Sequence, residues 1–353
     1  MGSLYSNFML AETVRALASE CGFELAGVAA AAPIDDFARY RRWTDEGMAG
    51  EMRYLTDRRG GMRGDLRSLL PSARSVICVG KLYNTPDGPL APGDARISRY
   101  AWGEDYHHVM RRGLELLLER LRAIEPFDAK ICVNTAPVLE RSLARLAGLG
   151  WIGKNTCLIN EPRGSWFFLG EIITSLDLEP ATPPPDRCGT CTSCIEACPT
   201  EAIVPDGGSG WTLDARLCIS YLTIELRGSI PPDLREGVGP HVYGCDICQD
   251  VCPWNSRAPV SSEPAFVRSP VSLAEIAALD EAAFRERFHA TPITRAKYSG
   301  LMRNAAVAMG NLNPEQYREP LTQLAAHESP LVREHAAWAL EQRAALRPAS
   351  DPP

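Results

Sequence analysis

The hydrophobic pattern in the first half of the chain alternates between helical and strand-like segments. Three segments place apolar residues at helical spacing: 11–22, 106–124 and 138–147. Three others are apolar runs typical of buried strands: 75–83, 130–134 and 164–178. This alternation predicts a mixed α/β domain over residues 1–180.

The second half of the chain has a different pattern. Residues 179–188, EPATPPPDRC, are rich in proline and predict a linker. A cysteine-rich domain is expected over 181–262 and a helical domain over 263–353. Segments 303–312 and 329–342 each place alanines on one helical face, which is typical of HEAT-like repeats, although a small helical cap has the same pattern. The final RPASDPP is expected to be a disordered tail.

Composition and charge narrow the class of protein. The chain has 353 residues, 45% of them hydrophobic and 23% charged, which indicates a folded protein. Its net charge of −7 argues against unselective coating of nucleic acid. A local basic patch is compatible with this net charge, because surface charges act over only about 10 Å. Neither a membrane span nor a secretory leader is recognisable, so we expect no membrane association and a cytoplasmic location.

Eight of the twelve cysteines lie between residues 188 and 252. The run RCGTCTSCIEACP (187–199) has the spacing of bacterial ferredoxins, in which three thiolates bind one 4Fe–4S cluster and the fourth binds another. The second run, YGCDICQDVCP (243–253), lacks its first cysteine because Val242 occupies that position. Cys218 is the remaining cysteine between the runs and can supply the missing ligand.

Two clusters can be assigned on this spacing. Cluster one is expected to use Cys188, Cys191, Cys194 and Cys252. Cluster two is expected to use Cys198, Cys218, Cys245 and Cys248. Zinc and disulfides are the alternatives, but zinc sites usually combine two CxxC pairs or add histidine. The other cysteines lie in apolar segments and are expected to be structural: Cys21, Cys78, Cys132 and Cys157.

Long motifs in almost every part of the chain are similar to those of the epoxyqueuosine reductase family. They are residues 97–111, 134–156, both cysteine runs, 218–231 and 294–311. The resemblance implies a cobalamin-dependent iron–sulfur enzyme that reduces epoxyqueuosine to queuosine at the wobble position of tRNA. It also implies three domains: a cobalamin-binding α/β domain, a ferredoxin-like dicluster domain and a C-terminal HEAT-like domain.

The resemblance implies a base-off cobalamin, reduced from cob(II) to cob(I) by the clusters. The common Asp-x-His-x-x-Gly cobalamin motif is absent, because Gly239 precedes His241 where aspartate is required. Such a cobalamin needs no histidine ligand from the protein. The candidate cobalamin contacts are Arg141, Lys154, Asn155 and Ser220.

The sequence departs from the family at its implied proton donor. The family has aspartate in a "DSAP" or "DTAP" motif, whereas this chain has Asn134 in NTAP. The amide could be an engineered change, a natural variant that relies on another acid, or the mark of a sister group with different chemistry. A second polar cluster, Asp105, Tyr106 and His107, suits proton transfer or substrate binding, although Asp105 could simply cap a helix.

The expected partners follow from the same resemblance. The tRNA contacts are expected at four basic residues: Arg227, Arg295, Lys297 and Arg303. A ferredoxin- or flavodoxin-type protein would supply electrons, and we expect a monomer. The alternative functions are a cobalamin reductase of another substrate, such as an organohalide, and a non-catalytic dicluster electron carrier or tRNA-binding protein.

Overall fold

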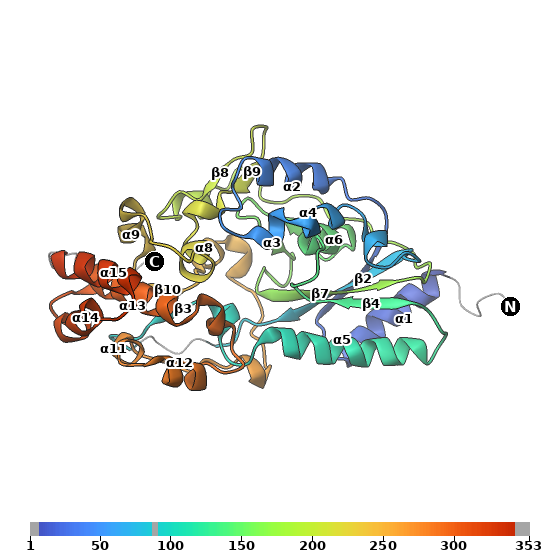
Figure 1. Ribbon diagram of the computed structural model, residues 1–353. Helices are drawn as coiled ribbons and strands as arrows, with labels where there is room; N and C mark the ends of the chain where they lie inside the picture. Colours follow the sequence, from blue (N-terminus) through green and yellow to red (C-terminus); the bar gives the residue numbers. More distant parts are fainter. Residues whose placement is uncertain (1–6, 87–90, 343–353) are drawn as a thin grey trace.

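A four-stranded antiparallel sheet forms the centre of the N-terminal half of the computed structural model, which describes residues 7–86 and 91–342 (Figure 1). Its strand order is β1–β2–β7–β4, with the bounds Leu25–Ala30, Ser75–Leu82, Phe167–Thr174 and Ala129–Cys132. Every residue of β2 is buried, as are all but one of β7. Because both faces of the sheet are covered, these strands are mostly apolar instead of alternating regularly with polar residues; Lys81 in β2 and Glu171 in β7 are among the buried exceptions.

Helices cover both faces of this sheet. α1 (Asn7–Glu20) and α5 (Tyr106–Arg122) pack on one face, and α6 (Glu140–Leu146) packs on the other (Figure 1). α6 lies very close to β1, because a Cβ atom added at Gly27 would come within 2.0 Å of the Ala147 carbonyl oxygen. Because this position has no side chain, the C-terminal end of α6 can lie directly against β1.

Short elements cover α6 and continue into the cysteine-rich region. The first domain adds α2 (Asp36–Asp45), α3 (Arg53–Thr56), α4 (Arg58–Met62), β3 (Arg96–Ile97), β5 (Trp151–Ile152) and β6 (Leu158–Ile159). The cysteine-rich region contains α7 (Ser193–Glu196), β8 (Ile203–Pro205), β9 (Trp211–Leu213), α8 (Ile219–Ile224), α9 (Pro232–Val238), β10 (His241–Tyr243) and α10 (Ile247–Asp250). Short 3-10 helices occur at Leu66–Ser68, Arg99–Ala101, Ala215–Leu217, Pro253–Asn255, Pro264–Phe266 and Pro292–Ala296.

The C-terminal part is helical. Its helices are α11 (Leu273–Ala277), α12 (Glu281–Arg287), α13 (Tyr298–Leu312), α14 (Arg318–Ala325) and α15 (Pro330–Glu341). α13 lies at the centre and is buried continuously over residues 300–310, against α15 on one side and the cysteine-rich region on another. Small alanine side chains let the neighbouring helices approach α13 closely.

Most of the predicted elements are confirmed within a few residues. The predicted helix 106–124 corresponds to α5, and the predicted strand 75–83 corresponds to β2. The mixed α/β class is also confirmed, with an antiparallel sheet. HEAT-like classification stays a prediction, and the expected disordered tail lies outside the described residues. Within the described ranges, no helix has the length and apolar character needed to cross a membrane.

Arg303 was expected to contact tRNA, and this prediction is wrong. The residue is only 1% exposed and lies inside the centre of α13. Its guanidinium donates to the carbonyl oxygens of residues 222, 226 and 228, at 2.6, 3.0 and 2.7 Å. Arg303 therefore joins α13 to the end of α8. A basic residue within an apolar helix carries no sequence signal that separates this role from a surface role.

We expect Arg303→Ala to destabilise the protein by about 3 kcal/mol, because it leaves buried carbonyl oxygens without a donor. The measurement is the shift in thermal unfolding of the full chain. Arg285→Ala is the matched control, because Arg285 forms an exposed pair with Glu281 and should leave the melting temperature almost unchanged. A variant of Arg303 that melts normally but loses RNA affinity would contradict this structural role.

Candidate active site

Asn134 lies in the loop between β4 and α6, at the edge of the sheet. Its backbone adopts a left-handed conformation with φ of +48°. Asparagine and aspartate tolerate this conformation better than most residues. The local backbone therefore suits either the amide present here or a carboxylate, and an exchange between them requires no change of loop conformation.

The Asn134 side chain lines a cavity of about 420 Å³ between three parts of the chain. Helices α2 and α3, together with Arg63 after α4, form one wall. The start of α6 forms the second wall, with Glu140 and Arg141, and β9 forms the third, with Leu213. The cavity is thus bounded by the sheet domain on two sides and by the cysteine-rich region on the remaining side.

Asn134 ends a short chain of polar contacts. Its Nδ2 lies 3.1 Å from Nε2 of His107, and Nδ1 of His107 lies 2.6 Å from Oδ1 of Asp105. An amide N–H donates to Nε2, so Nε2 carries a lone pair and the imidazole proton is on Nδ1, facing Asp105. The structure therefore brings together three of the residues that were expected to be catalytic.

Asp105 and the neighbouring Tyr106 are poorly suited to release a proton. Burial alone would raise the pKa of Asp105, but hydrogen bonds from the side chain and backbone of His107 hold this pKa below its usual value. Asp105 also caps α5, as the alternative interpretation expected. Tyr106 stacks on Phe168 with ring centroids 4.2 Å apart, and burial raises its phenol pKa far above the usual value.

Two glutamates were missed from the sequence: the half-buried Glu140 beside Asn134, and the buried Glu171 in β7. Glu140 begins α6, and its Oε1 accepts a hydrogen bond from the backbone N–H of Asn134. Burial raises the pKa of Glu140 to about 6. Glu171 lies in β7, is 0% exposed, and has a pKa raised well above its usual value by burial and then by Glu140. A lone acid within the apolar run FFLGEIIT was the available signal.

The four residues expected to contact cobalamin separate into two groups. Arg141 lines the cavity and donates to the carbonyl and hydroxyl oxygens of Thr156. Lys154, Asn155 and Ser220 do not line it. Ser220 instead hydrogen-bonds the thiol of Cys218.

Lys154 and Asn155 hold the cysteine loops. Nζ of Lys154 donates to the carbonyl oxygens of Gly189 and Cys191, both at 2.8 Å. Nδ2 of Asn155 donates to the carbonyl oxygen of Cys248 at 3.1 Å. Spacing along the sequence could not show this, because these contacts join residues 35 or more positions apart. The two side chains connect the glycine-rich turn after α6 with both cysteine runs.

The structure gathers the eight cysteines into the two groups assigned from spacing. The thiol of Cys194 lies within electrostatic range of those of Cys188, Cys191 and Cys252. The second group consists of Cys198, Cys218, Cys245 and Cys248, linked by the same kind of interaction. Their roles as ligands remain predictions.

Cys157 lies beside the second group, although it was expected to be a structural residue elsewhere. It is hydrogen-bonded to Cys248, and this bond lowers the pKa of the Cys157 thiol. All twelve cysteines are free thiols. Among the described residues, no three His, Cys, Asp or Glu side chains converge on a single metal ion. In a 4Fe–4S cubane, the four thiolates bind four separate irons.

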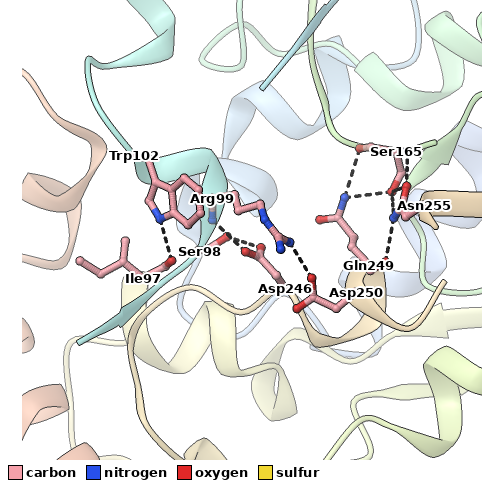
Figure 2. A network of polar contacts seen from close by, with 9 residues as sticks. All are labelled: Ile97, Ser98, Arg99, Trp102, Ser165, Asp246, Gln249, Asp250 and Asn255. Carbon is pink, nitrogen blue, oxygen red and sulfur yellow. Dashed lines mark hydrogen bonds and ion pairs between the residues drawn. The ribbon is translucent and has the colours of Figure 1, made fainter. Parts of the chain in front are cut away.

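A polar network fastens the second cysteine run to the sheet domain (Figure 2). The half-buried Asp246, which follows Cys245, accepts hydrogen bonds from the hydroxyl of Ser98 and the backbone N–H of Arg99. The Arg99 side chain reaches Asp250. Further along, Gln249 donates to the carbonyl and hydroxyl oxygens of Ser165 at 3.1 and 2.9 Å (Figure 2).

The remaining basic residues expected at the RNA interface differ in availability. Arg227 and Lys297 are exposed. Arg295 forms an ion pair with Glu225 at 2.6 Å and lies over the ring of Tyr54. Arg227 and Lys297 can therefore meet a phosphate directly, whereas Arg295 must first leave or share its carboxylate partner.

Comparisons with known proteins identify the family. Residues 63–135 match the family described as epoxyqueuosine reductase QueG, DUF1730, and residues 187–255 match the 4Fe-4S double cluster binding domain. Epoxyqueuosine reductase from Xanthomonas campestris is 43% identical over 344 residues, which cover 94% of this chain and 96% of the relative. The chain belongs to the epoxyqueuosine reductase family. The Escherichia coli member is 37% identical over 95% of this chain and 89% of its own.

Solved epoxyqueuosine reductases have the same fold. One, in complex with an epoxyqueuosine-modified tRNA-Tyr stem loop, superimposes with a TM-score of 0.85 and 29% identity over 95% of this chain and 90% of its own. The Bacillus subtilis enzyme, with a TM-score of 0.83 and 29% identity over 95% of this chain and 90% of its own, has an aspartate-bearing catalytic loop swung out of its active site. The cofactors of epoxyqueuosine reductases are cobalamin and two 4Fe–4S clusters.

The cavity suits cobalamin in two respects. Arg63 is only 6% exposed, and its Nε has no hydrogen-bond partner among the described residues. A buried guanidinium N–H without an acceptor can donate to a polar group of a bound corrinoid. The described residues that line the cavity include no histidine. The lining therefore agrees with a cobalamin that takes no imidazole ligand from the protein.

Serine substitutions should distinguish Cys218, a predicted cluster ligand, from Cys157, which only lies beside the predicted ligands. We expect Cys218→Ser to remove about half of the bound iron and the signal of one of two clusters, because cluster two loses a thiolate. Iron and sulfide analysis with electron paramagnetic resonance measures this. Cys157→Ser is the matched control and should keep both clusters, although its sulfur lies beside Cys248. Iron loss in the Cys157 variant alone would reverse the assignment.

Proposed function

We propose that this chain reduces epoxyqueuosine to queuosine at the wobble position of tRNA, in the cytoplasm. The observation that supports this most directly is the cavity lined by Asn134, which adjoins both the sheet domain and the cysteine-rich region. A substrate bound there would lie beside the electron supply. Sequence similarity over almost the whole chain supports the same activity.

The cofactors would occupy the two regions that meet at this cavity. Arg63 and Arg141 would hold cobalamin, through the unpartnered Nε of Arg63 and the remaining N–H groups of Arg141. When bound and reduced, cobalamin supplies a strongly reducing, nucleophilic cobalt centre. The two cysteine groups would hold clusters in series, and a ferredoxin- or flavodoxin-type protein would reduce them.

The reaction requires a source of protons near the cavity. Conversion of an epoxide to an alkene and water consumes two electrons and two protons. The departing oxygen becomes strongly basic, so a positioned acid contributes about two to four orders of magnitude in rate. Asn134 can hydrogen-bond this oxygen but has no proton to release at working pH. The protein must therefore supply the protons from other residues or from water.

The tRNA would lie across the cavity entrance, with its phosphates near exposed basic residues. Arg227 and Lys297 are the contacts we favour, with Arg295 as a weaker one because of its ion pair. Each phosphate contact should add to the salt dependence of binding. We also propose that the protein acts as a monomer.

The decisive experiment supplies the purified protein with cobalamin, a chemical reductant and epoxyqueuosine-containing tRNA. Mass spectrometry of the digested tRNA should show queuosine. The same incubation without cobalamin is the control. Binding of the tRNA without any queuosine, in a protein that holds both clusters and cobalamin, would favour the tRNA-binding alternative instead.

Restoring the family's acid should accelerate the reaction. We expect Asn134→Asp to raise the single-turnover rate by up to about two orders of magnitude, because a carboxyl group can protonate the leaving oxygen. The positive φ of the loop tolerates this exchange. Asn134→Ala is the control and should not gain rate. An unchanged rate in the aspartate variant would argue against any acid role at this position.

A further inference from the structure

A row of three polar side chains crosses the centre of the sheet. Cys78 of β2 and Cys132 of β4 both lie directly opposite Glu171 of β7. Directly opposed residues of antiparallel strands point to the same face of the sheet, so the three side chains are neighbours. Both thiols belong to the core that α6 covers. Glu171 therefore lies between the sheet and α6, away from solvent.

Glu171 must carry a proton in this environment. Its side chain is 0% exposed, and neither carboxyl oxygen has a hydrogen-bond partner among the described residues. A buried carboxylate without a counter-charge or hydrogen bonds would cost several kcal/mol. Accordingly, burial raises the pKa of Glu171 well above its usual value.

Glu140 connects this buried carboxyl group with the cavity. It interacts electrostatically with Glu171 on its inner side, and it lines the cavity next to Asn134 on its outer side. Its Oε1 accepts the backbone N–H of Asn134, which holds the carboxyl group at the base of the loop. The pair thus leads from the interior of the sheet domain to the wall beside the family's proton-donor position.

The charged and titratable groups around Glu140 come from several elements. They are Arg141 on its own helix, Glu171 on β7, Cys132 on β4, Cys78 on β2, His107 and Tyr106 on α5, and Arg63 after α4. Burial is the largest influence and opposes ionisation, whereas the bond from Asn134 and the nearby cations favour it. The balance keeps Glu140 able to exchange its proton near neutral pH.

We propose that Glu140 is the catalytic acid of this chain: it protonates the oxygen that leaves the epoxide. This inference rests on the proposed function. The two electrons come from the reductant through the clusters. The carbon–oxygen bonds break, the carbon–carbon double bond forms, and the oxygen takes one proton from Glu140. After solvent has returned a proton to Glu140, the second proton completes water.

The other groups near the cavity are less suited to this role. His107 has its proton on Nδ1, facing Asp105 and away from Asn134. Asp36, the other carboxyl group in the cavity wall, is ion-paired with Arg145 at 3.1 Å. Asn134 offers only hydrogen bonds. Glu140 is the carboxyl group that adjoins both the Asn134 loop and a buried neutral acid.

Glu140→Gln is the critical substitution, because glutamine can still accept the Asn134 N–H but cannot release a proton. We expect its single-turnover rate to fall about 10²- to 10⁴-fold, with tRNA affinity unchanged. The wild-type rate should be highest at low pH and fall as pH rises through about 6, the pKa of Glu140. This pH dependence should be absent from the glutamine variant.

An infrared titration of the protein without tRNA provides a readout that does not depend on activity. A protonated-carboxyl band should disappear as pH rises through about 6 in the wild type. Asp246, whose pKa burial also raises to about 6, contributes a similar band to every variant. The Glu140 part of the band should therefore appear in the difference between the wild type and Glu140→Gln, and should be absent from the difference between the wild type and Glu281→Gln, a matched exposed glutamate in α12. If the Glu140→Gln variant does not fold, Glu140→Asp replaces it in the kinetic test and should retain a falling rate–pH profile.

The outcomes separate this inference from the proposed function. Adding Asn134→Asp to the Glu140→Gln variant should restore the rate, because a second acid is then present. A Glu140→Gln variant with normal rate and normal pH dependence would reduce Glu140 to a positioning residue for the loop. If Asn134→Asp makes queuosine and the wild type does not, only the inference fails. If neither makes queuosine with both cofactors bound, the proposed function fails as well.

Discussion

The contacts between side chains of the sheet domain and the backbone of the cysteine loops determine the geometry of the whole site. Lys154 and Asn155 donate to carbonyl oxygens in both cysteine runs. Gln249 and the Asp246 carboxylate form the reverse contacts, from the second run to the sheet domain. Because one partner in each bond is a backbone group, these bonds hold the backbone of the loops directly. Electron delivery across the interface requires this fixed spacing.

The segment from Glu140 to Asn155 explains why the proposed proton donor and the cysteine groups lie on different sides of the cavity. α6 begins at Glu140, beside the loop of Asn134, and is followed by the turn that carries Lys154 and Asn155. One end of this segment therefore contacts the buried carboxyl groups of the sheet, and the other contacts the cysteine loops. Gly27 lets α6 lie directly on β1, which keeps both ends in position. α6 thus lies between the glutamates and the cysteine loops, and the cavity adjoins both regions.

The sequence was informative where chemistry depends on spacing, and less so where it depends on burial. The cysteine runs and the strand-end position of Asn134 could be recognised from the chain alone, because local spacing determines them. Arg303 could not be separated from the surface arginines, since only the packing around α13 buries it. Lys154 was expected in the cavity, but its partner Gly189 lies 35 positions away in the chain. Glu171 had a signal, an acid within an apolar strand, whereas its neighbour Glu140 resembled an ordinary first-turn helix residue.

Glu140 and Glu171 also help to explain why the loop at position 134 can hold either an amide or an acid. An aspartate at position 134 would add a third carboxyl group at the corner occupied by Glu140 and Glu171. Like charges so close cannot all ionise, so the protons would be shared and at least one group would remain neutral. The pair would thus help to keep an aspartate protonated and able to act as an acid. With Asn134, no third charge is present, and the proton that this environment retains lies on the glutamates. The sheet domain therefore supplies a protonated carboxyl group near the start of α6 whether residue 134 is asparagine or aspartate. Residue 134 determines which carboxyl group lies nearest to the substrate.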